Sequence, residues 1–238
     1  MAKYKAERGI ITAAGLGSRL LPITAETTKP LVEVNGRVII ESLIDGMIQH
    51  GVEEIYIVIG HLKGKFAYLP EKYGQIKLEL IENPYYNIHN NISSLYVARE
   101  YLKNCIIAEG DLLIYNPEIF VPDFDVSSYC GLWANETKEW LLKTDANGIV
   151  SSCSRTGGTN GWQMFGVSFW REEDGEKLKK HLEDIYVEKK ITDIFWDDIP
   201  LFYCKDEYQL KIRNIHDADI IEIDTIEELV GIDAAYSK

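Results

Sequence analysis

Glycines and basic side chains near the start of the chain are the first residues whose types and spacing suggest chemistry. Gly15 and Gly17 follow a short apolar run, and Arg19 and Lys29 come soon after them, with Lys29 next to Pro30. A glycine loop exposes backbone N–H groups and lets a ligand approach closely, and the two cations add positive charge. The segment therefore predicts a binding site for a polyanion, because a strand end followed by free N–H groups attracts phosphate.

Two common phosphate-binding loops do not match this segment. The chain lacks the pattern G-x-x-x-x-G-K-[ST], and Leu20 stands where a dinucleotide-binding loop needs its third glycine. The pattern that remains is A-A-G-x-G-[ST]-R-L-x-P, followed by T-K-P. A strand and turn with incidental charges is the alternative interpretation. This interpretation is disfavoured because the glycine loop, the arginine, the proline and the lysine occur together and in this order.

Two aspartates follow apolar runs in different parts of the chain. Asp111 comes after residues 105–108, and Asp224 comes after residues 220–223. Carboxylates at two strand ends suit Mg²⁺, a hard cation that takes oxygen ligands and keeps water and phosphate oxygens. The alternative for Asp224 is a role as cap of the last helix, beside Thr225. The chain has no H-E-x-x-H pattern and no cysteine cluster, so the sequence predicts no zinc site.

An amide-rich loop and two aromatic segments offer further recognition groups. Residues 83–96 read N-P-Y-Y-N-I-H-N-N-I-S-S-L-Y, and an amide can read the edge of a nucleobase because it supplies donors and an acceptor. Capping of the next helix, by Ser93 for example, is the alternative. Trp140 and Trp196 lie beside acidic residues in polar segments, where aromatic faces can hold a quaternary ammonium group. For each tryptophan the alternative is a place in the core.

The elements that must position these residues alternate in the first half of the chain. Apolar runs at 9–14, 55–59, 76–81 and 105–108 are typical of strands. The segments 38–50, 62–73 and 93–102 are typical of helices, the second of them broken near Pro70. Such alternation predicts parallel βαβ units, whose ligands bind at the carboxyl ends of the strands.

The second half of the chain predicts antiparallel or mixed pairing. Strand patterns occur at 129–133, 140–144, 149–153 and 164–170, and the turn D-A-N-G at 145–148 is typical of a hairpin. An amphipathic helix at 172–187, strands at 208–212 and 220–223, and a helix at 225–230 follow. Thr225 and Glu228 have the spacing of a capping box at the start of that last helix.

The composition restricts the compartment and the partners. The chain has 238 residues and a formal net charge of −13, which argues against a nucleic-acid backbone as a partner. The N-terminal residues lack the apolar core of a signal peptide, and no apolar run approaches the roughly 18 residues of a membrane span. We expect a cytoplasmic protein with no membrane partner, and a homo-oligomer or a fusion to a further domain stays open. Reduced thiols are expected at all four cysteines, which are Cys105, Cys130, Cys153 and Cys204.

Together these motifs resemble those of the nucleotidyltransferases that make nucleoside-diphosphate sugars and related activated alcohols. Over residues 10–229 the chain is similar to the bacterial CTP:phosphocholine cytidylyltransferases. The resemblance implies a Rossmann-like α/β/α sandwich of the glycosyltransferase-A type with a mixed sheet. It implies one domain over residues 1–238, with a nucleotide-binding half at about 9–111 and an acceptor-binding half at about 112–238.

The resemblance also implies roles for single residues. Arg19, Lys29 and Asp111 are implied to be catalytic, and Asp111 and Asp224 are implied to hold Mg²⁺. The nucleotide-binding residues that it implies are Ala13, Ala14, Gly15, Gly17, Ser18, Arg19, Lys29, Asn83, Asn91 and Ser94. The choline-binding residues that it implies are Trp140, Phe195 and Trp196, with Asp193 or Asp197 beside them.

The reaction implied by the resemblance joins two anions. With Mg²⁺ bound, the phosphate of phosphocholine makes an in-line attack on the α-phosphate of CTP. Pyrophosphate leaves as CDP-choline forms. No general base is needed, because the acceptor phosphate is already a nucleophile. One alternative keeps the fold and takes phosphoethanolamine, 2-aminoethylphosphonate or a sugar 1-phosphate as acceptor. Another alternative is a regulatory nucleotide-binding domain without turnover.

Overall fold

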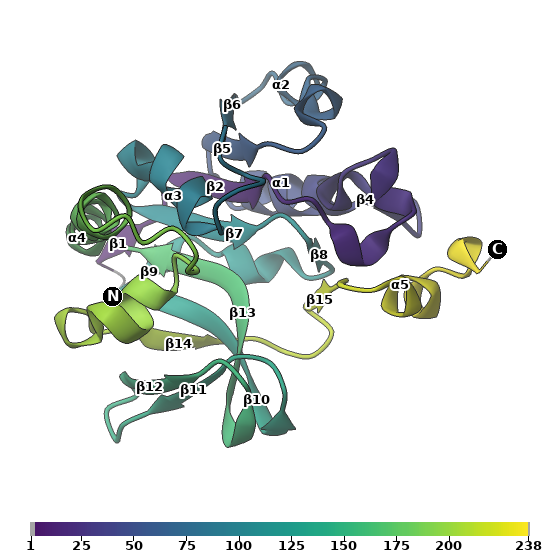
Figure 1. Ribbon diagram of the computed structural model, residues 1–238. Helices are drawn as coiled ribbons and strands as arrows, with labels where there is room; N and C mark the ends of the chain where they lie inside the picture. Colours follow the sequence, from purple (N-terminus) through teal and green to yellow (C-terminus); the bar gives the residue numbers. More distant parts are fainter. Residues whose placement is uncertain (1–2, 238) are drawn as a thin grey trace.

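A large mixed β-sheet with helices on both faces forms the body of the protein (Figure 1). The coordinates are a computed structural model that describes residues 3–237. The main sheet runs β12-β11-β13-β7-β2-β5-β6, with β10 paired to β13 and β14 paired to β10. The strands of this sheet are β2 (Arg8–Ala13), β5 (Glu54–Ile59), β6 (Lys77–Glu82), β7 (Cys105–Glu109), β10 (Ser128–Thr137), β11 (Leu141–Thr144), β12 (Val150–Ser154), β13 (Gly158–Trp170) and β14 (Lys211–Asn214).

The first half of the chain supplies the parallel part of the sheet, as predicted. Strands β7, β2, β5 and β6 pair in parallel, and the apolar runs of β7, β2 and β5 are buried on both faces. Successive strand residues point to opposite faces, so Ile11 packs toward α1 (Ile39–Gln49) while Ile10 packs toward α3 (Ile92–Val97) and α4 (Glu172–Leu182). A continuous apolar strand is stable here because helices cover both of its faces.

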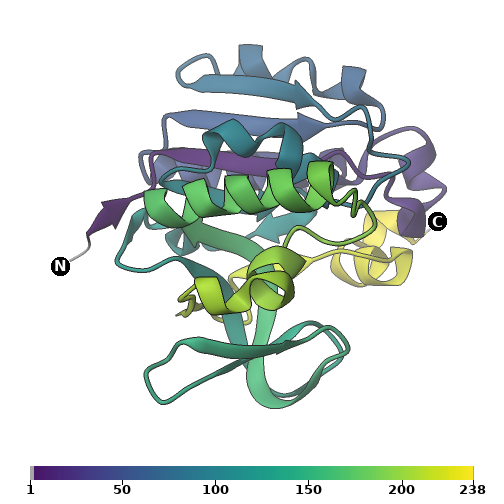
Figure 2. The ribbon, with the colours of Figure 1, turned by 60° about the vertical axis from the view of Figure 1, so that its left-hand side comes forward.

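The second half forms the predicted antiparallel part and a projecting arm. Strand β13 pairs antiparallel with β7 at its C-terminal end and with β10 along most of its length, so it joins the two halves of the chain. Beyond that junction, β10 and β13 extend away from the parallel strands together with β11 and β12, whereas α4 lies across the sheet (Figure 2). One end of the arm therefore remains next to the carboxyl ends of β2 and β7.

Several element boundaries differ from the sequence-based expectation. Helix α4 ends at Leu182 and continues as the π-helical turn η7 (Glu183–Glu188), and the segment expected to be a broken helix forms η4 (Lys63–Phe66) and α2 (Leu69–Lys72). The strand expected at 208–212 begins only at Lys211. The expected helix at 93–102 divides into α3 and the turn η5 (Arg99–Tyr101). The remaining short elements are β1 (Tyr4–Lys5), β9 (Asp123–Phe124), β3 (Glu33–Val34), β4 (Arg37–Val38), η1 (Ser18–Leu20), η2 (Ile23–Ala25), η3 (Lys29–Leu31), η6 (Pro117–Phe120), η8 (Ile199–Tyr203), η9 (Lys205–Glu207) and η10 (Ala234–Tyr236).

A short strand that was not predicted pairs with the strand expected at 220–223 and links the two aspartates. Strand β8 (Leu112–Ile114) starts directly after Asp111 and pairs antiparallel with β15 (Ile220–Glu222), so Glu222 lies opposite Leu112. Three apolar residues are too short a run to read as a strand by periodicity. The pairing brings the segment that ends in Asp224 beside Asp111, although the two aspartates are far apart in the sequence.

The predicted capping box at the last helix, α5 (Ile226–Ile232), is confirmed. The Thr225 hydroxyl accepts a hydrogen bond from the Glu228 N–H, and the Glu228 carboxylate accepts one from the Thr225 N–H at 2.9 Å. The same carboxylate accepts a hydrogen bond from the Asp224 N–H at 2.8 Å. Thr225 rather than Asp224 is therefore the cap, and the Asp224 side chain is free to face the interior of the molecule.

All four cysteines are free thiols, and Cys105 and Cys130 are fully buried, in agreement with the sequence-based expectation. Among residues 3–237, no helix is both long enough and apolar enough to cross a membrane.

Candidate active site

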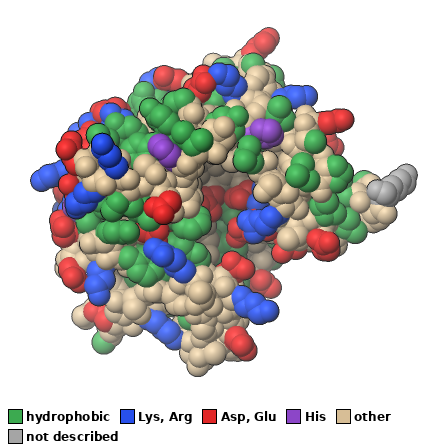
Figure 3. Space-filling model, in the orientation of Figure 1, with side chains coloured by type: hydrophobic (Ala, Val, Ile, Leu, Met, Phe, Trp, Pro, Cys, Tyr) green, Lys and Arg blue, Asp and Glu red, His purple; other side chains and the backbone are tan. Residues whose placement is uncertain are grey.

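A cleft of about 540 Å³ lies at the carboxyl ends of the parallel strands, where the sequence predicted ligand binding. Residues from both halves of the chain line it, from the glycine loop and the amide-rich loop to the base of the arm and β15. In the space-filling view a hollow opens in this face, with acidic side chains at its floor and basic ones at its edge (Figure 3). The predicted site residues on its wall are Ala13, Ala14, Gly15, Gly17, Ser18, Arg19, Lys29, Asn83, Asn91, Ser94, Asp111, Trp140, Phe195, Asp197 and Asp224.

The glycine loop has the backbone shape that the sequence predicted. Gly17 adopts a left-handed conformation with φ of 63°, and a Cβ atom there would lie 3.0 Å from a Thr24 methyl and 3.1 Å from the Lys29 Cβ. The Thr24 hydroxyl donates a hydrogen bond of 2.9 Å to the Gly17 carbonyl, which holds the turn closed. A Cβ at Gly15 would meet no atom within 4 Å, so the loop stands open at that point. Glycine is required at Gly17 for its conformation and gives access at Gly15.

Lys29 lies between the two predicted metal ligands. Its Nζ donates hydrogen bonds to Asp111 Oδ2 at 2.8 Å and to Asp224 Oδ1 at 2.6 Å. Lys29 is only 8% exposed, and burial alone lowers the pKa of its ammonium group. The two carboxylates outweigh this effect and hold the Lys29 pKa above its ordinary value. Arg19 joins the group from the exposed side, because its guanidinium donates to Asp224 Oδ2 at 2.8 Å.

A third carboxylate, Glu222, belongs to the same group and was not predicted. Oxygen atoms of Asp111, Glu222 and Asp224 all lie within 4.8 Å of one another. Burial, together with the charges of Asp111 and Asp224 and against that of Lys29, raises the pKa of Glu222 to about 8. The pattern I-E-I-D at 221–224 could have predicted this. Residues two apart on an extended chain point to the same side, so Glu222 lies on the same side as Asp224.

These three carboxylates fit a divalent metal ion. Asp111 Oδ1 is buried and has no hydrogen-bond partner among the described residues. A buried oxygen without a partner costs free energy, and a cation would supply the missing contact. Three carboxylates in reach of one point form the all-oxygen ligand set that hard cations such as Mg²⁺ take.

The amide-rich loop lines the cleft, but two of its amides mainly hold the loop in shape. The Asn83 amide donates to the Ser93 and Ser94 hydroxyls at 2.9 and 3.1 Å, and its oxygen accepts from the Tyr85 N–H at 2.9 Å. Asn91 Oδ1 accepts a hydrogen bond of 2.9 Å from the backbone N–H of Trp196. Contact of Asn83, Asn91 or Ser94 with a nucleobase stays a prediction.

The predicted aromatic box forms only in part. The rings of Trp140 and Phe195 line the cleft, with centres 5.5 Å apart and planes at 82°. Trp196 is only 3% exposed and packs against Tyr129 and Trp170 in the core, so it does not face the cleft. Asp193 is exposed and lies outside the lining.

The expectation for Trp196 and Asp193 is therefore corrected, and Asp197 is the carboxylate of that pair that reaches the cleft. Phe195 and Asp197 face the cleft while the residue between them faces the opposite way, into the apolar cluster around α4. The polar neighbours of Trp196 in the sequence cannot predict which side chains face the cleft. They show the composition of the segment and not the direction of each side chain.

Replacement of Trp196 by alanine is expected to act on stability. Removing a buried indole leaves a cavity and typically costs about 3–5 kcal/mol of unfolding free energy. Chemical denaturation should show this loss, with a smaller loss for Trp196→Phe, which keeps most of the packing. Trp196 Nε1 has no hydrogen-bond partner within residues 3–237, so the phenylalanine variant breaks no hydrogen bond there. An unchanged midpoint together with a selective rise in the acceptor KM would instead place the indole at the substrate.

Carboxylates at the base of the arm form a second acidic part of the cleft. Glu109, Glu139 and Asp197 line it, and the sequence analysis singled out only the last. Burial raises the pKa of Asp197 to about 7, while the Tyr129 hydroxyl donates a 2.9 Å hydrogen bond to its Oδ1. A Cβ at Gly166 would lie within van der Waals overlap of Glu109, so this glycine makes room for a carboxylate beside the sheet. The end of the cleft next to Trp140 therefore suits a cation.

Comparison with known proteins finds relatives along nearly the whole chain. Residues 9–121 match the MobA-like NTP transferase domain. A 2-aminoethylphosphonate cytidylyltransferase of Lancefieldella rimae is 36% identical over 95% of this chain and 92% of its own length. A choline-phosphate cytidylyltransferase of Streptococcus pneumoniae is 32% identical over 93% of this chain and 94% of its own length.

Solved structures lead to the same class of protein. The CTP:phosphocholine cytidylyltransferase of Streptococcus pneumoniae has a TM-score of 0.87 at 31% identity, with 96% of this chain and 98% of that chain covered. An inositol-1-phosphate CTP transferase of T. maritima shares the fold, with a TM-score of 0.79 at 16% identity. The fold and the relatives are those of enzymes that transfer nucleotidyl groups. The chain belongs to the nucleotidyltransferase family and, within it, to the cytidylyltransferases.

Proposed function

We propose that this cytidylyltransferase transfers the cytidylyl group of CTP to a small acceptor with an anionic phosphorus group at one end and an ammonium group at the other. The polarity of the cleft carries the proposal. Arg19, Lys29 and the glycine loop line one part of the cleft together with Asp111, Glu222 and Asp224, and the rings of Trp140 and Phe195 line it with Asp197 nearby in the chain. An acceptor with both charges would be oriented with its phosphorus group toward the nucleotide.

We take 2-aminoethylphosphonate as the acceptor that this geometry favours. A trimethylammonium group needs free aromatic faces, and a primary ammonium group needs oxygen acceptors. The Arg155 guanidinium already lies 5.7 Å from the Trp140 ring centre, and its Nε donates a 2.8 Å hydrogen bond to Asp198. With Trp196 in the core, carboxylates are the more available partners. The Lancefieldella rimae relative has this acceptor in its name.

Phosphocholine, the acceptor expected from the sequence, is the second candidate. The Trp140–Phe195 pair lines the cleft, and choline-phosphate cytidylyltransferases of Streptococcus pneumoniae and Haemophilus influenzae are 32% and 30% identical to this chain. Both acceptors require the same transfer chemistry and differ in how the ammonium group is held.

The residues of this chain would act by binding and neutralising charge. The glycine loop, Lys29 and Arg19 would hold the triphosphate, and an oxygen of the acceptor would attack the α-phosphorus as its bond to the bridging oxygen of pyrophosphate breaks. The acceptor oxygen is already anionic, so no proton is removed. Asp111, Glu222 and Asp224 would hold a divalent cation, for which we propose Mg²⁺. Such a cation neutralises charge on phosphate oxygens.

Release of pyrophosphate across a matrix of acceptors and nucleoside triphosphates tests the proposal. With CTP and Mg²⁺, we expect kcat/KM to be highest for 2-aminoethylphosphonate and lower for phosphoethanolamine and phosphocholine. A maximum at phosphocholine would select the second candidate. A maximum at a sugar 1-phosphate, or no release with any acceptor, would contradict the proposal itself.

Asp197→Asn is expected to weaken binding of the acceptor selectively. Loss of one charged hydrogen-bond acceptor typically costs about 1.5–3 kcal/mol, which corresponds to a roughly 10- to 100-fold rise in the acceptor KM. The KM for CTP should stay within about twofold, because Asp197 lies at the other end of the cleft. Asp193→Asn is the matched control, because this carboxylate is exposed outside the cleft. Equal rises for both substrates would indicate a general structural effect.

A further inference from the structure

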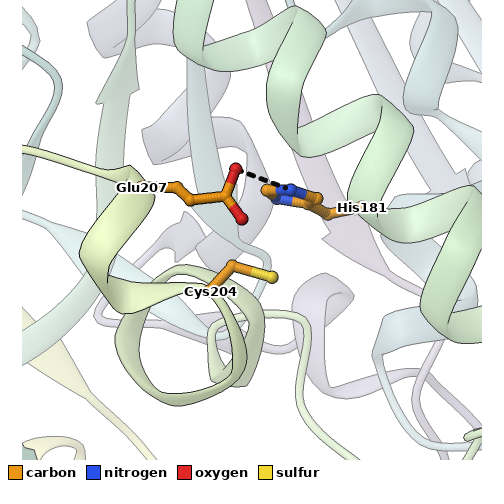
Figure 4. A group of neighbouring side chains, drawn as sticks. All are labelled: His181, Cys204 and Glu207. Atoms are coloured by element: carbon orange, nitrogen blue, oxygen red, sulfur yellow. Dashed lines mark ion pairs between the residues drawn. The ribbon is translucent and has the colours of Figure 1, made fainter.

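A cluster of metal-binding side chains lies outside the cleft. His181 near the end of α4, Cys204 after η8 and Glu207 in η9 point toward one another (Figure 4). Their ligand atoms all lie within 4.8 Å of one another, and the His181 Nε2 to Glu207 Oε2 distance is 3.3 Å. None of the three lines the cleft, and the proposed transfer reaction has no use for them.

We propose that His181, Cys204 and Glu207 bind a zinc ion. Imidazole nitrogen, thiolate sulfur and carboxylate oxygen are the three ligand types that Zn²⁺ takes, and a tetrahedral site with three protein ligands leaves one position for water. Zinc bond lengths place neighbouring ligand atoms of such a site about 3.3–3.8 Å apart. The His181–Glu207 distance of 3.3 Å already lies at the lower end of this range, and the Cys204 Sγ lies within 4.8 Å of both ligand atoms. A thiolate ligand also selects against Mg²⁺, which prefers oxygen.

The imidazole of His181 is already oriented for this role. Its Nδ1 lies 2.8 Å from the hydroxyl of Tyr208, and the two rings meet edge to face with centres 5.7 Å apart. A hydrogen bond from Nδ1–H to that hydroxyl leaves the lone pair on Nε2, the atom that faces Glu207. Metal-binding histidines commonly use their second nitrogen in this way. Both His181 and Tyr208 are mostly buried, so binding would restrict little additional motion.

The nearby charges leave room for a cation. Lys177 donates to Asp174 Oδ1 at 3.2 Å, a carboxylate that it shares with Arg171, and also to the Glu207 carbonyl. Lys189 donates to Asp184 Oδ2 at 2.7 Å, so both ammonium groups have a carboxylate partner. On binding, the Cys204 thiol would release its proton to solvent. The thiolate and Glu207 would then supply two negative charges against the two positive charges of Zn²⁺.

The sequence predicted no zinc site because these residues form no short motif. Only Cys204 and Glu207 are near each other in the sequence, and folding brings the turns η8 and η9 against α4. The ion would connect the end of α4 to the turn after η8. The segment 183–203 between them carries Phe195 and Asp197, so zinc would stabilise the loop that forms the acceptor end of the cleft.

Titration of the full-length, chelator-treated protein with Co²⁺ in excess Mg²⁺ tests the site. We expect about one equivalent to bind with a thiolate-to-Co²⁺ charge-transfer band in the near ultraviolet. Added Zn²⁺ should abolish the band and raise the melting temperature. The three carboxylates Asp111, Glu222 and Asp224 supply no sulfur ligand. Co²⁺ bound to them therefore cannot give this band. The outcome therefore does not depend on which acceptor the enzyme uses.

Three variants and one control identify the ligands. Cys204→Ser should abolish the band, and His181→Gln and Glu207→Gln should each weaken Co²⁺ binding by tenfold or more. Cys153→Ser is the matched control, because Cys153 is also a partly exposed thiol but lies on β12. Glu207 is exposed, so its substitution tests the site without disturbing the core. No band in the wild type, a band that survives Cys204→Ser, or one that disappears with Cys153→Ser would overturn the proposal.

Discussion

Replacement of Lys29 by alanine is expected to lower kcat for pyrophosphate release by about 10²- to 10³-fold, the usual effect of removing one group that stabilises charge in a transition state. Lys29 Nζ lies between Asp111 and Asp224 and is nearly buried, so its charge acts where solvent screens it little. Steady-state kinetics at saturating CTP and acceptor measure the effect.

The same variant should remain folded when Mg²⁺ is present. Without the ammonium group, Asp111 loses its ion pair and Asp224 keeps only the one with Arg19, while both stay close to Glu222. The melting temperature should therefore fall in chelator and recover with Mg²⁺. Lys63→Ala is the matched control, since Lys63 forms an exposed ion pair with Glu82 outside the cleft. Normal turnover in Lys29→Ala would remove this residue from the mechanism.

Replacement of Asp111 by asparagine is the second change with a large expected effect. Asparagine keeps the size of the side chain but removes the charge of a proposed metal ligand, whose Oδ1 is buried and has no hydrogen-bond partner in the described part of the chain. We expect kcat to fall by about 10²-fold or more, and the Mg²⁺ concentration for half-maximal activity to rise by about tenfold or more. Titration of activity with Mg²⁺ separates the two effects.

A control from the arm distinguishes loss of the metal ligand from a general loss of charge. Asp145 caps the turn between β11 and β12 by accepting hydrogen bonds from the N–H groups of Asn147 and Ile149, each at 2.9 Å. Asparagine at this position can still accept these bonds, so Asp145→Asn should leave the Mg²⁺ titration unchanged. An Asp111→Asn enzyme with an unchanged Mg²⁺ requirement would show that this carboxylate does not hold the ion.

Local patterns in the sequence were sufficient for the parallel half of the fold. The apolar runs that form β2, β5 and β7 lie where they were predicted, because a strand covered by helices on both faces must be apolar throughout. The glycine turn at 15–17 and the capping box at Thr225 were also predicted, since each depends on a few neighbouring residues. The meeting of Lys29 with Asp111 at the strand ends follows from the same βαβ order.

Only the tertiary structure decided which side chains share the cleft. The pairing of β8 with β15 adds Glu222 to the two aspartates, and the packing around α4 turns Trp196 into the core while Asp197 faces the acceptor end. The His181 cluster depends in the same way on η8 and η9 lying against α4. The sequence by itself determined which segments become strands, helices and turns, because those choices depend on neighbours along the chain. The direction of a side chain outside a regular element depends on contacts with distant segments, which only the folded molecule supplies.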